Sequence, residues 1–212
     1  MQELNVLIVG VSGLGKCMVM EALERGVRVS VLVRNRAKLE AELGKEAVAK
    51  LRKVTIGDGT QATVLDEALP GIDVVLSGRG ADPHLAQELA VAVKRHGVKK
   101  LCWPAGSTNV MADDGVTPNY KRLMHLGSWV EGAYRTHGAC IDAIRQARIN
   151  YVIFCPGRMS SVGKRSQDVR SSVRINRDGG GFVSYEDAAW VMLQAATTNT
   201  YDRELISAGT KH

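Results

Sequence analysis

The sequence predicts an α/β fold with a doubly wound, mostly parallel sheet and helices on both faces. Short apolar runs, such as 6–9 and 151–155, are typical of strands that are buried on both faces. Segments with helical spacing separate these runs, and this alternation favours parallel strands joined by crossover helices. Because such crossovers are right-handed, the expected strand order is 3-2-1-4-5-6, with a possible seventh strand.

The first half of the chain alternates regularly between the two kinds of element. Glycine turns end the helices, because Gly26, Pro70-Gly71 and Gly97 each follow the last residue with helical spacing. Polar turns follow the strands. We expect strands at 6–9, 27–33, 52–56, 73–76 and 100–103, and helices at 14–25, 36–50, 61–69 and 84–96.

The second half is less regular. A helical region should be interrupted by three glycines, and Ser184 should cap a later helix because Glu186 and Asp187 occupy its first turn. No linker or repeat divides the sequence, so we expect a single domain over 1–212, with a small substrate-side region at about 156–212. The expected segments are an irregular stretch over 104–118, a helical region over 119–148 interrupted at Gly127, Gly132 and Gly138, a strand over 151–155, a basic loop over 158–181 and a last strand over 203–207.

Composition narrows the classes of protein that the chain can belong to. Apolar content is 45% and charged content 24%, which is ordinary for a globular domain, and no apolar run approaches a membrane span. The four cysteines lie far apart and form no metal-binding spacing, so we expect reduced thiols, no metal site and a cytoplasmic protein. The net charge is +6, but aromatic residues are only 5%, which makes nucleic acid an unlikely partner. We expect a monomer or a weak dimer.

The turn after the first strand has two interpretations. Gly10, Gly13 and Gly15 would let the backbone approach a pyrophosphate at the start of a helix, as in a dinucleotide-binding Rossmann fold. The same residues, 10–17, also spell G-x-x-x-x-G-K-C, one residue from a P-loop. A thiol is a poor magnesium ligand, and no later strand ends in the aspartate that would help to hold the metal. The rest of the chain favours the dinucleotide interpretation.

Ligands of such a sheet bind at the carboxyl ends of the strands. The second strand ends in Arg34, where an acidic residue would select NAD; a guanidinium there matches the 2′-phosphate of NADP. Arg36 is a second candidate for that phosphate, and Asp58 follows the third strand, where the adenine would lie. The loop that begins at Ser77 and Gly78 should approach the ribose and nicotinamide. We therefore expect the cofactor NADP to contact Gly10, Ser12, Gly13, Leu14, Gly15, Arg34, Arg36, Asp58, Ser77 and Gly78.

Five stretches in this order resemble a known family. Residues 10–13, 31–34, 56–58, 71–75 and 183–187, together with the ending 197–202, are similar to the atypical short-chain dehydrogenase/reductases of the NmrA-like group. Within that group the likeness is greatest to the NADPH-dependent flavin reductases of the biliverdin reductase B type. The resemblance covers nearly the whole chain. It implies a Rossmann fold that binds NADP, and hydride transfer to a flavin, a quinone or a tetrapyrrole in an open pocket.

The resemblance also suggests residues near the substrate. Ser107 takes the place of serines that the group carries after the fifth strand, and His137 stands where the group often has a helical histidine. Pro156 and Arg158 follow the sixth strand, where a substrate-side histidine is usual; an arginine there favours an anionic acceptor. A further departure is Lys16, which replaces the third glycine of G-x-x-G-x-x-G. We expect Lys16 to lie beside the phosphates or over the start of the helix.

Three functions fit these observations. The first is an NADPH-dependent reductase of a flavin, a quinone or another aromatic or conjugated acceptor. Neither Tyr120 nor Tyr134 is followed by lysine at the spacing Tyr-x-x-x-Lys, which argues against an alcohol dehydrogenase, because that lysine lowers the pKa of the proton-donating tyrosine. The second is a non-catalytic NADP-sensing protein, and the third is a P-loop nucleotide hydrolase.

Overall fold

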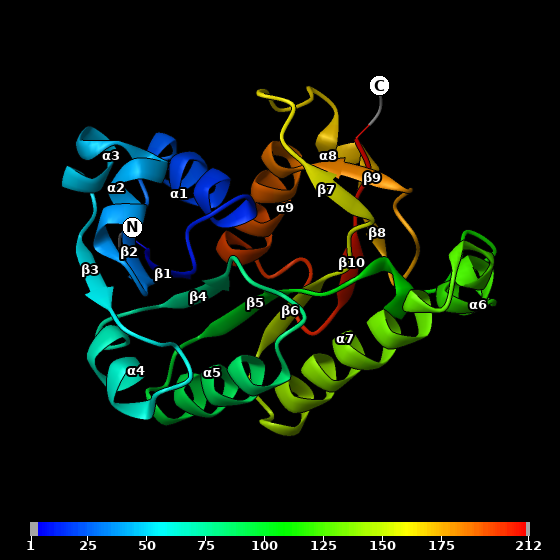
Figure 1. Cartoon of the computed structure of the whole chain (residues 1–212), viewed down its shortest axis with the longest axis horizontal. Helices are drawn as coiled ribbons and strands as arrows, with labels where there is room; N and C mark the ends of the chain where they lie inside the picture. Colours follow the sequence, from blue (N-terminus) through cyan, green and yellow to red (C-terminus); the bar gives the residue numbers. More distant parts are fainter. Residues whose placement is uncertain (1–3, 211–212) are drawn as a thin grey trace.

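The computed structural model describes residues 4–210 and has an eight-stranded sheet between two layers of helices (Figure 1). The strand order β3-β2-β1-β4-β5-β6-β10-β8 contains the predicted order 3-2-1-4-5-6, and β10 is the predicted seventh strand. Of the described strands in this sheet, only β8 runs antiparallel, against β10. A separate two-stranded sheet pairs β7 with β9.

The strands are short, as the apolar runs predict. Their bounds are Asn5–Val9 (β1), Arg28–Val33 (β2), Lys53–Ile56 (β3), Val74–Ser77 (β4), Lys100–Pro104 (β5), Tyr151–Phe154 (β6), Arg158–Ser160 (β7), Arg174–Ile175 (β8), Phe182–Ser184 (β9) and Leu205–Ser207 (β10). The helices are Leu14–Glu24 (α1), Arg36–Leu43 (α2), Lys45–Ala49 (α3), Ala62–Ala68 (α4), Pro83–Arg95 (α5), Asn119–Leu123 (α6), Trp129–Gln146 (α7), Val169–Ser172 (α8) and Tyr185–Thr197 (α9). Two short 3₁₀ helices span Ser107–Asn109 (η1) and Met124–Leu126 (η2).

The core lies on both faces of the sheet because alternate residues of a strand point to opposite faces. In β1, Val6 and Ile8 face α1 and α9, whereas Leu7 and Val9 face α4, α5 and α7. Every one of these four side chains is buried. The uninterrupted apolar run of the first strand is therefore explained by helices on both sides.

The structure corrects the expected helices at three glycines. The helix expected over 36–50 is two helices, because Gly44 has a φ of 80° and separates α2 from α3. Gly127, with a φ of 130°, ends η2 before α7, as predicted. Gly132 and Gly138, however, lie within α7 and do not interrupt it, since helical dihedrals are open to glycine at a modest entropic cost.

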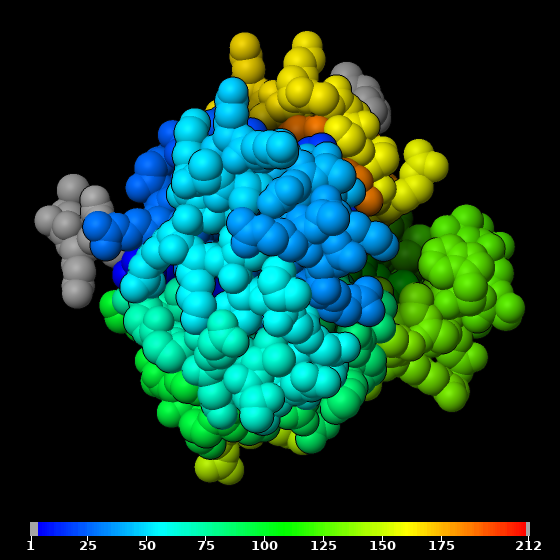
Figure 2. All heavy atoms as spheres, turned by 60° about the vertical axis from the view of Figure 1, so that its left-hand side comes forward, coloured from blue at the N-terminus to red at the C-terminus, as the bar shows by residue number. Residues whose placement is uncertain are grey.

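The basic segment 158–181 is also more ordered than a loop. It contains β7, α8 and β8, and β8 extends the main sheet beyond β10. In Figure 2 this segment (yellow) lies at the top of the molecule, while the segment around α6 (green) projects at one side. No helix within residues 4–210 is long and apolar enough to cross a membrane.

Candidate functional site

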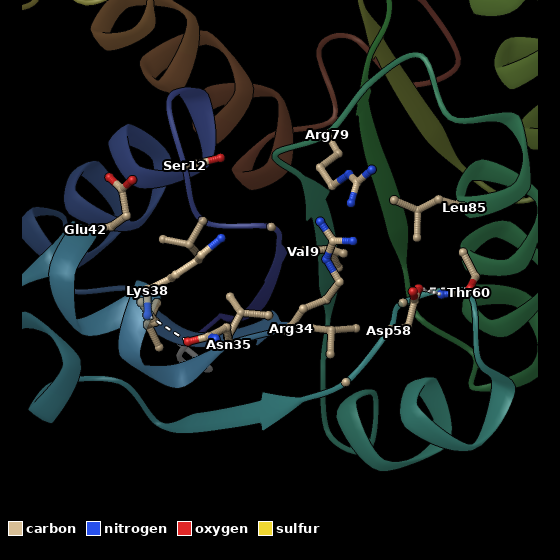
Figure 3. Close-up of a pocket in the computed structure, with 17 residues that line it drawn as sticks. Val9, Ser12, Arg34, Asn35, Lys38, Glu42, Asp58, Thr60, Arg79 and Leu85 are labelled. Atoms are coloured by element: carbon tan, nitrogen blue, oxygen red, sulfur yellow. Dashed lines mark hydrogen bonds between the residues drawn. The ribbon is translucent and has the colours of Figure 1, made fainter.

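A pocket of about 780 Å³ opens at the carboxyl ends of β1, β2 and β3, where the sequence places its polar turns. The turn after β1, the start of α2, the turn after β3 and the loop after β4 form its walls (Figure 3). The polar and glycine residues of its lining are Gly10, Ser12, Arg34, Asn35, Lys38, Glu42, Gly57, Asp58, Gly59, Thr60 and Arg79.

Three cations face this pocket. Arg34 and Arg79 extend toward one another from β2 and from the loop after β4, and Lys38 lies on the first turns of α2 (Figure 3). The backbone N–H and the hydroxyl of Thr60 both donate to Asp58, each at 2.9 Å, and these bonds lower the pKa of its carboxyl. The charges of Arg34 and Arg79 lower that pKa further. Asp58 is therefore ionised at neutral pH, and three cations against Asp58 and Glu42 leave the lining net positive.

Three glycines meet beneath the turn. A Cβ atom added at Gly15 would lie 2.0 Å from the carbonyl oxygen of Gly10, and one added at Gly78 would lie 2.2 Å from the same oxygen. The Cβ of Gly78 would also lie 2.9 Å from the Cα of Gly15. A side chain is therefore excluded at position 15, and Gly15 makes the close contact between helix and strand that the resemblance assigned to position 16.

Because Gly15 makes this contact, position 16 can carry the long charged side chain of Lys16. Its Nζ lies 3.7 Å from Glu42 of α2, and both side chains are partly exposed. This contact directs the Lys16 side chain from the first turn of α1 toward the end of α2, and its expected position beside the phosphates or over the start of the helix stays a prediction. We predict that Lys16→Gly leaves dinucleotide binding largely intact.

The turn has the properties that a phosphate requires. Gly13 is the N-cap of α1 with a φ of 50°, and no side chain caps the amides of this helix. The first turn of α1 also contains no acidic residue, so the positive end of the helix dipole is not neutralised there. A dinucleotide phosphate fits this turn for three reasons. The amides of the helix are uncapped, the three glycines leave no side chain in the way, and cations lie nearby.

Six of the ten predicted cofactor residues lie outside this lining. Gly13 and Gly15 belong to the glycine turn, and Leu14 and Gly78 line a second pocket, whereas Arg36 and Ser77 line neither pocket. Arg36 is on the exposed face of α2, where its Nε is 3.1 Å from Glu40. Lys38, not Arg36, lines the first pocket together with Arg34. Ser77 is buried: its hydroxyl donates to the carbonyl of Arg79 at 2.6 Å and accepts from the Arg79 N–H at 3.1 Å. Ser77 therefore shapes the loop that carries Arg79.

A second pocket of about 630 Å³ lies on the other side of the glycine turn, and its lining is mostly apolar. Leu14 and Gly78 line it, which connects it to the turn. The structure brings Ser107, His137, Pro156 and Arg158, which come from three separate segments, together in this pocket. Leu126 of η2 and Trp129 at the start of α7 form its outer wall, and their exposed fractions are 52% and 59%.

His137 lies against the backbone of this pocket. A Cβ added at Gly106 would be 2.9 Å from its Nε2, so only glycine leaves room for the ring. Its Nδ1 is buried and has no hydrogen-bond partner among residues 4–210. Burial lowers the pKa of His137, because the charged imidazolium loses solvation, and the ring is therefore neutral at pH 7.

This lowered pKa has a consequence for stability. The unfolded chain takes up a proton near the ordinary His pKa of about 6.5, whereas the folded chain resists it, so stability falls as the pH drops below that value. We expect the Tm advantage of the wild type over His137→Gln to shrink between about pH 7.5 and 5.5. Thermal unfolding at both pH values measures it, with the exposed His84→Gln as the control. An advantage that grows toward acid pH would contradict a lowered pKa.

Several residues of the two pockets were not predicted as site residues. Arg79 stands between two glycines of the loop after β4, and a cation at the carboxyl end of a strand is a signal that the sequence does carry. Arg122 and Asp178 form an ion pair in the wall of the second pocket, and Asp178 is buried. Nothing in the sequence pairs these two, because 55 residues separate them.

Comparison with known proteins identifies the family. A sequence model described as NAD(P)H-binding matches residues 10–199, which is most of the chain. The protein belongs to this NAD(P)H-binding family. The match favours the dinucleotide interpretation of the glycine turn over the P-loop. No curated protein matched the sequence.

Solved structures share the fold at low sequence identity. A short-chain dehydrogenase/reductase from Veillonella parvula, in complex with NADP, has a TM-score of 0.75 and 14% identity over 98% of this chain and 94% of that one. A protein from Streptococcus pneumoniae assigned as an NADH-flavin reductase has a TM-score of 0.73 and 17% identity over 96% and 98%. The anaerobilin reductase ChuY from Escherichia coli O157:H7 has a TM-score of 0.70 and 16% identity over 96% and 95%. At these identities the likeness establishes the α/β fold alone.

Proposed function

We propose that the protein is an NADPH-dependent reductase that transfers a hydride to a flavin, a quinone or a similar conjugated acceptor. The observation that carries the proposal is the pair of pockets that meet at the glycine turn. One is lined by cations and the other is mostly apolar. A dinucleotide that crosses the turn would place its adenosine end in the first pocket and its nicotinamide in the second, where the acceptor also binds.

NADPH fits the first pocket better than NADH. Arg34 directly follows β2 and Lys38 lies on the first turn of α2, so positive charge faces the place that the ribose would take. A 2′-phosphate offers a guanidinium two strong acceptor oxygens, whereas a 2′-hydroxyl offers it neither charge nor a bidentate partner. The Asp58 carboxylate accepts two hydrogen bonds from Thr60 and lies near enough to Arg34 and Arg79 for their charges to lower its pKa.

The second pocket suits an acceptor that stabilises its own negative charge. When bound, the nicotinamide supplies the hydride. No tyrosine or lysine occurs among the residues that line this pocket in the described part of the chain, so the proton donor of an alcohol dehydrogenase is missing. A flavin or a quinone spreads the charge over its rings and accepts a proton from water. Ser107 and His137 are two lining groups that can position or protonate such an acceptor.

The proposal is tested by NADPH oxidation with FMN, riboflavin and quinones, followed at 340 nm. Turnover with at least one of these acceptors supports it. Tight NADPH binding without turnover would favour the NADP-sensing alternative, which requires different affinities for NADP⁺ and NADPH. Calorimetry with MgATP addresses the P-loop alternative. Burial raises the pKa of the Cys17 thiol to about 11, so the residue at the magnesium-binding position of a P-loop stays protonated here.

Arg158 is expected to contact an anionic group of the acceptor, such as the phosphate of FMN. Its guanidinium lies 5.9 Å from the centre of the Phe182 ring and is exposed at the mouth of the second pocket. We expect Arg158→Gln to raise the KM for FMN about five- to tenfold, because one exposed charge contact contributes about 1 kcal/mol. Riboflavin, which lacks the phosphate, should be affected little. Equal effects on both flavins would mean that Arg158 does not contact the phosphate.

A further inference from the structure

The ring of Tyr185 covers the glycine turn. A Cβ added at Gly13 would lie 3.1 Å from the Cζ and 3.2 Å from the hydroxyl of Tyr185. Tyr185 is the first residue of α9, which lies alongside α1 (Figure 1). The C-terminal third of the chain therefore supplies a phenol directly over the N-cap of α1, a contact that the sequence alone did not indicate.

This phenol lies at the boundary between the two pockets. Ser12 lines the first pocket and Leu14 lines the second, and Gly13 stands between them. A dinucleotide that occupies both pockets must pass its pyrophosphate over this turn. The Tyr185 ring is partly buried. Among the described residues 4–210, the adjoining Ser184, Glu186 and Asp187 form side-chain hydrogen bonds, but the Tyr185 hydroxyl takes part in none of these bonds.

The neighbours of Tyr185 fasten another segment. Ser184 is buried and caps α9 by accepting the N–H of Asp187 at 3.0 Å. Asp187, also buried, accepts from the N–H of Ser166 at 2.7 Å and from its hydroxyl at 2.9 Å. Glu186 accepts from the Ser161 hydroxyl at 2.5 Å and from the N–H groups of Val162 and Gly163 at 3.1 Å and 3.0 Å. Segment 161–166 therefore depends on the first turn of α9.

We propose that Tyr185 is a cofactor-binding residue whose hydroxyl donates a hydrogen bond to the pyrophosphate of the bound dinucleotide. The inference rests on the proposed binding of NADPH. Glu186 and Asp187, which adjoin Tyr185, hold segment 161–166. A bond from Tyr185 to the pyrophosphate would therefore couple cofactor binding at the turn to the order of this segment, which follows Arg158 of the second pocket. Cofactor binding then stiffens the segment that directly follows β7, whose residues Arg158 and Met159 line the second pocket.

The test compares Tyr185→Phe with the wild type by calorimetry. The variant keeps the ring that packs on Gly13 and loses only the donor. We expect its Kd for NADPH to rise about tenfold, as for a hydrogen bond to a charged group. Binding of 2′-AMP, which has the 2′-phosphate but no pyrophosphate, should not change. Tyr201→Phe is the control, because Tyr201 packs against the same core cluster away from the turn.

Hydrogen exchange gives a second readout. NADPH should slow amide exchange in 161–166 in the wild type and less so in Tyr185→Phe at saturating cofactor. An unchanged Kd in a variant with the wild-type Tm would overturn the inference while leaving the proposed function standing. If the wild type itself fails to bind NADPH, the proposed function is wrong and the inference is wrong with it.

Discussion

Replacing Gly15 with alanine is expected to abolish detectable dinucleotide binding and to destabilise the fold. The added Cβ would lie 2.0 Å from the carbonyl oxygen of Gly10, and backbone, not a flexible side chain, occupies that space. The turn over 10–15 must therefore move by about an ångström to restore ordinary contact. The loss of two hydrogen bonds to a charged phosphate costs about 3 kcal/mol, which is more than a hundredfold in Kd. Overpacking destabilises the fold by about 1–3 kcal/mol.

Gly132→Ala is the matched control for this variant. Gly132 lies inside α7, and nothing lies within 4 Å of an added Cβ. Alanine there should raise the free energy of unfolding by about 0.5–1 kcal/mol and leave the Kd for NADPH unchanged. Calorimetry and thermal unfolding measure both quantities. Wild-type binding by Gly15→Ala would show that the close contact of Gly10, Gly15 and Gly78 does not form the binding turn.

Seven of the eight strands of the main sheet could be predicted from the sequence because each carries a local signal, whereas β8 lies in the segment 158–181 that was expected to be a loop. In β1 the run from Val6 to Val9 is apolar throughout, and only a strand covered by helices on both faces uses such a run. The breaks within helices were less predictable. Of Gly44 and Gly132, only Gly44 adopts a positive φ. Because glycine is permitted in both conformations, the residue type alone does not predict which of them ends a helix.

The first pocket was predictable in outline because it is built from turns that directly follow strands. Arg34 and Asp58 line it for this reason, whereas Arg36, three residues beyond β2, lies on α2 and pairs with Glu40. Tyr185 and Trp129 reach the site from helices remote in sequence. Their placement follows from packing of α9 on α1 and from the break at Gly127, neither of which a local pattern encodes.

Arg34→Gln is expected to remove the proposed preference for NADPH, so that the variant binds NADPH and NADH with similar affinities. The Arg34 side chain points into the first pocket toward Arg79, and glutamine keeps much of its length without its charge (Figure 3). A charge-assisted bond to the 2′-phosphate contributes about 1.5–3 kcal/mol, so the Kd for NADPH should rise about 10- to 100-fold. The Kd for NADH should change little, because NADH has no phosphate at that position.

Arg36→Gln tests the alternative assignment of the same phosphate. Arg36 is two residues away in sequence and carries the same charge, but its side chain pairs with Glu40 outside the pocket. We expect the Kd of this variant for NADPH and for 2′-AMP to stay within about twofold of the wild type, because an exposed pair contributes little and long-range charge is screened by salt. Affinity for 2′-AMP should fall in Arg34→Gln alone. An equal loss of NADH and NADPH binding in Arg34→Gln would mean that Arg34 supports the structure of the pocket and does not recognise the phosphate.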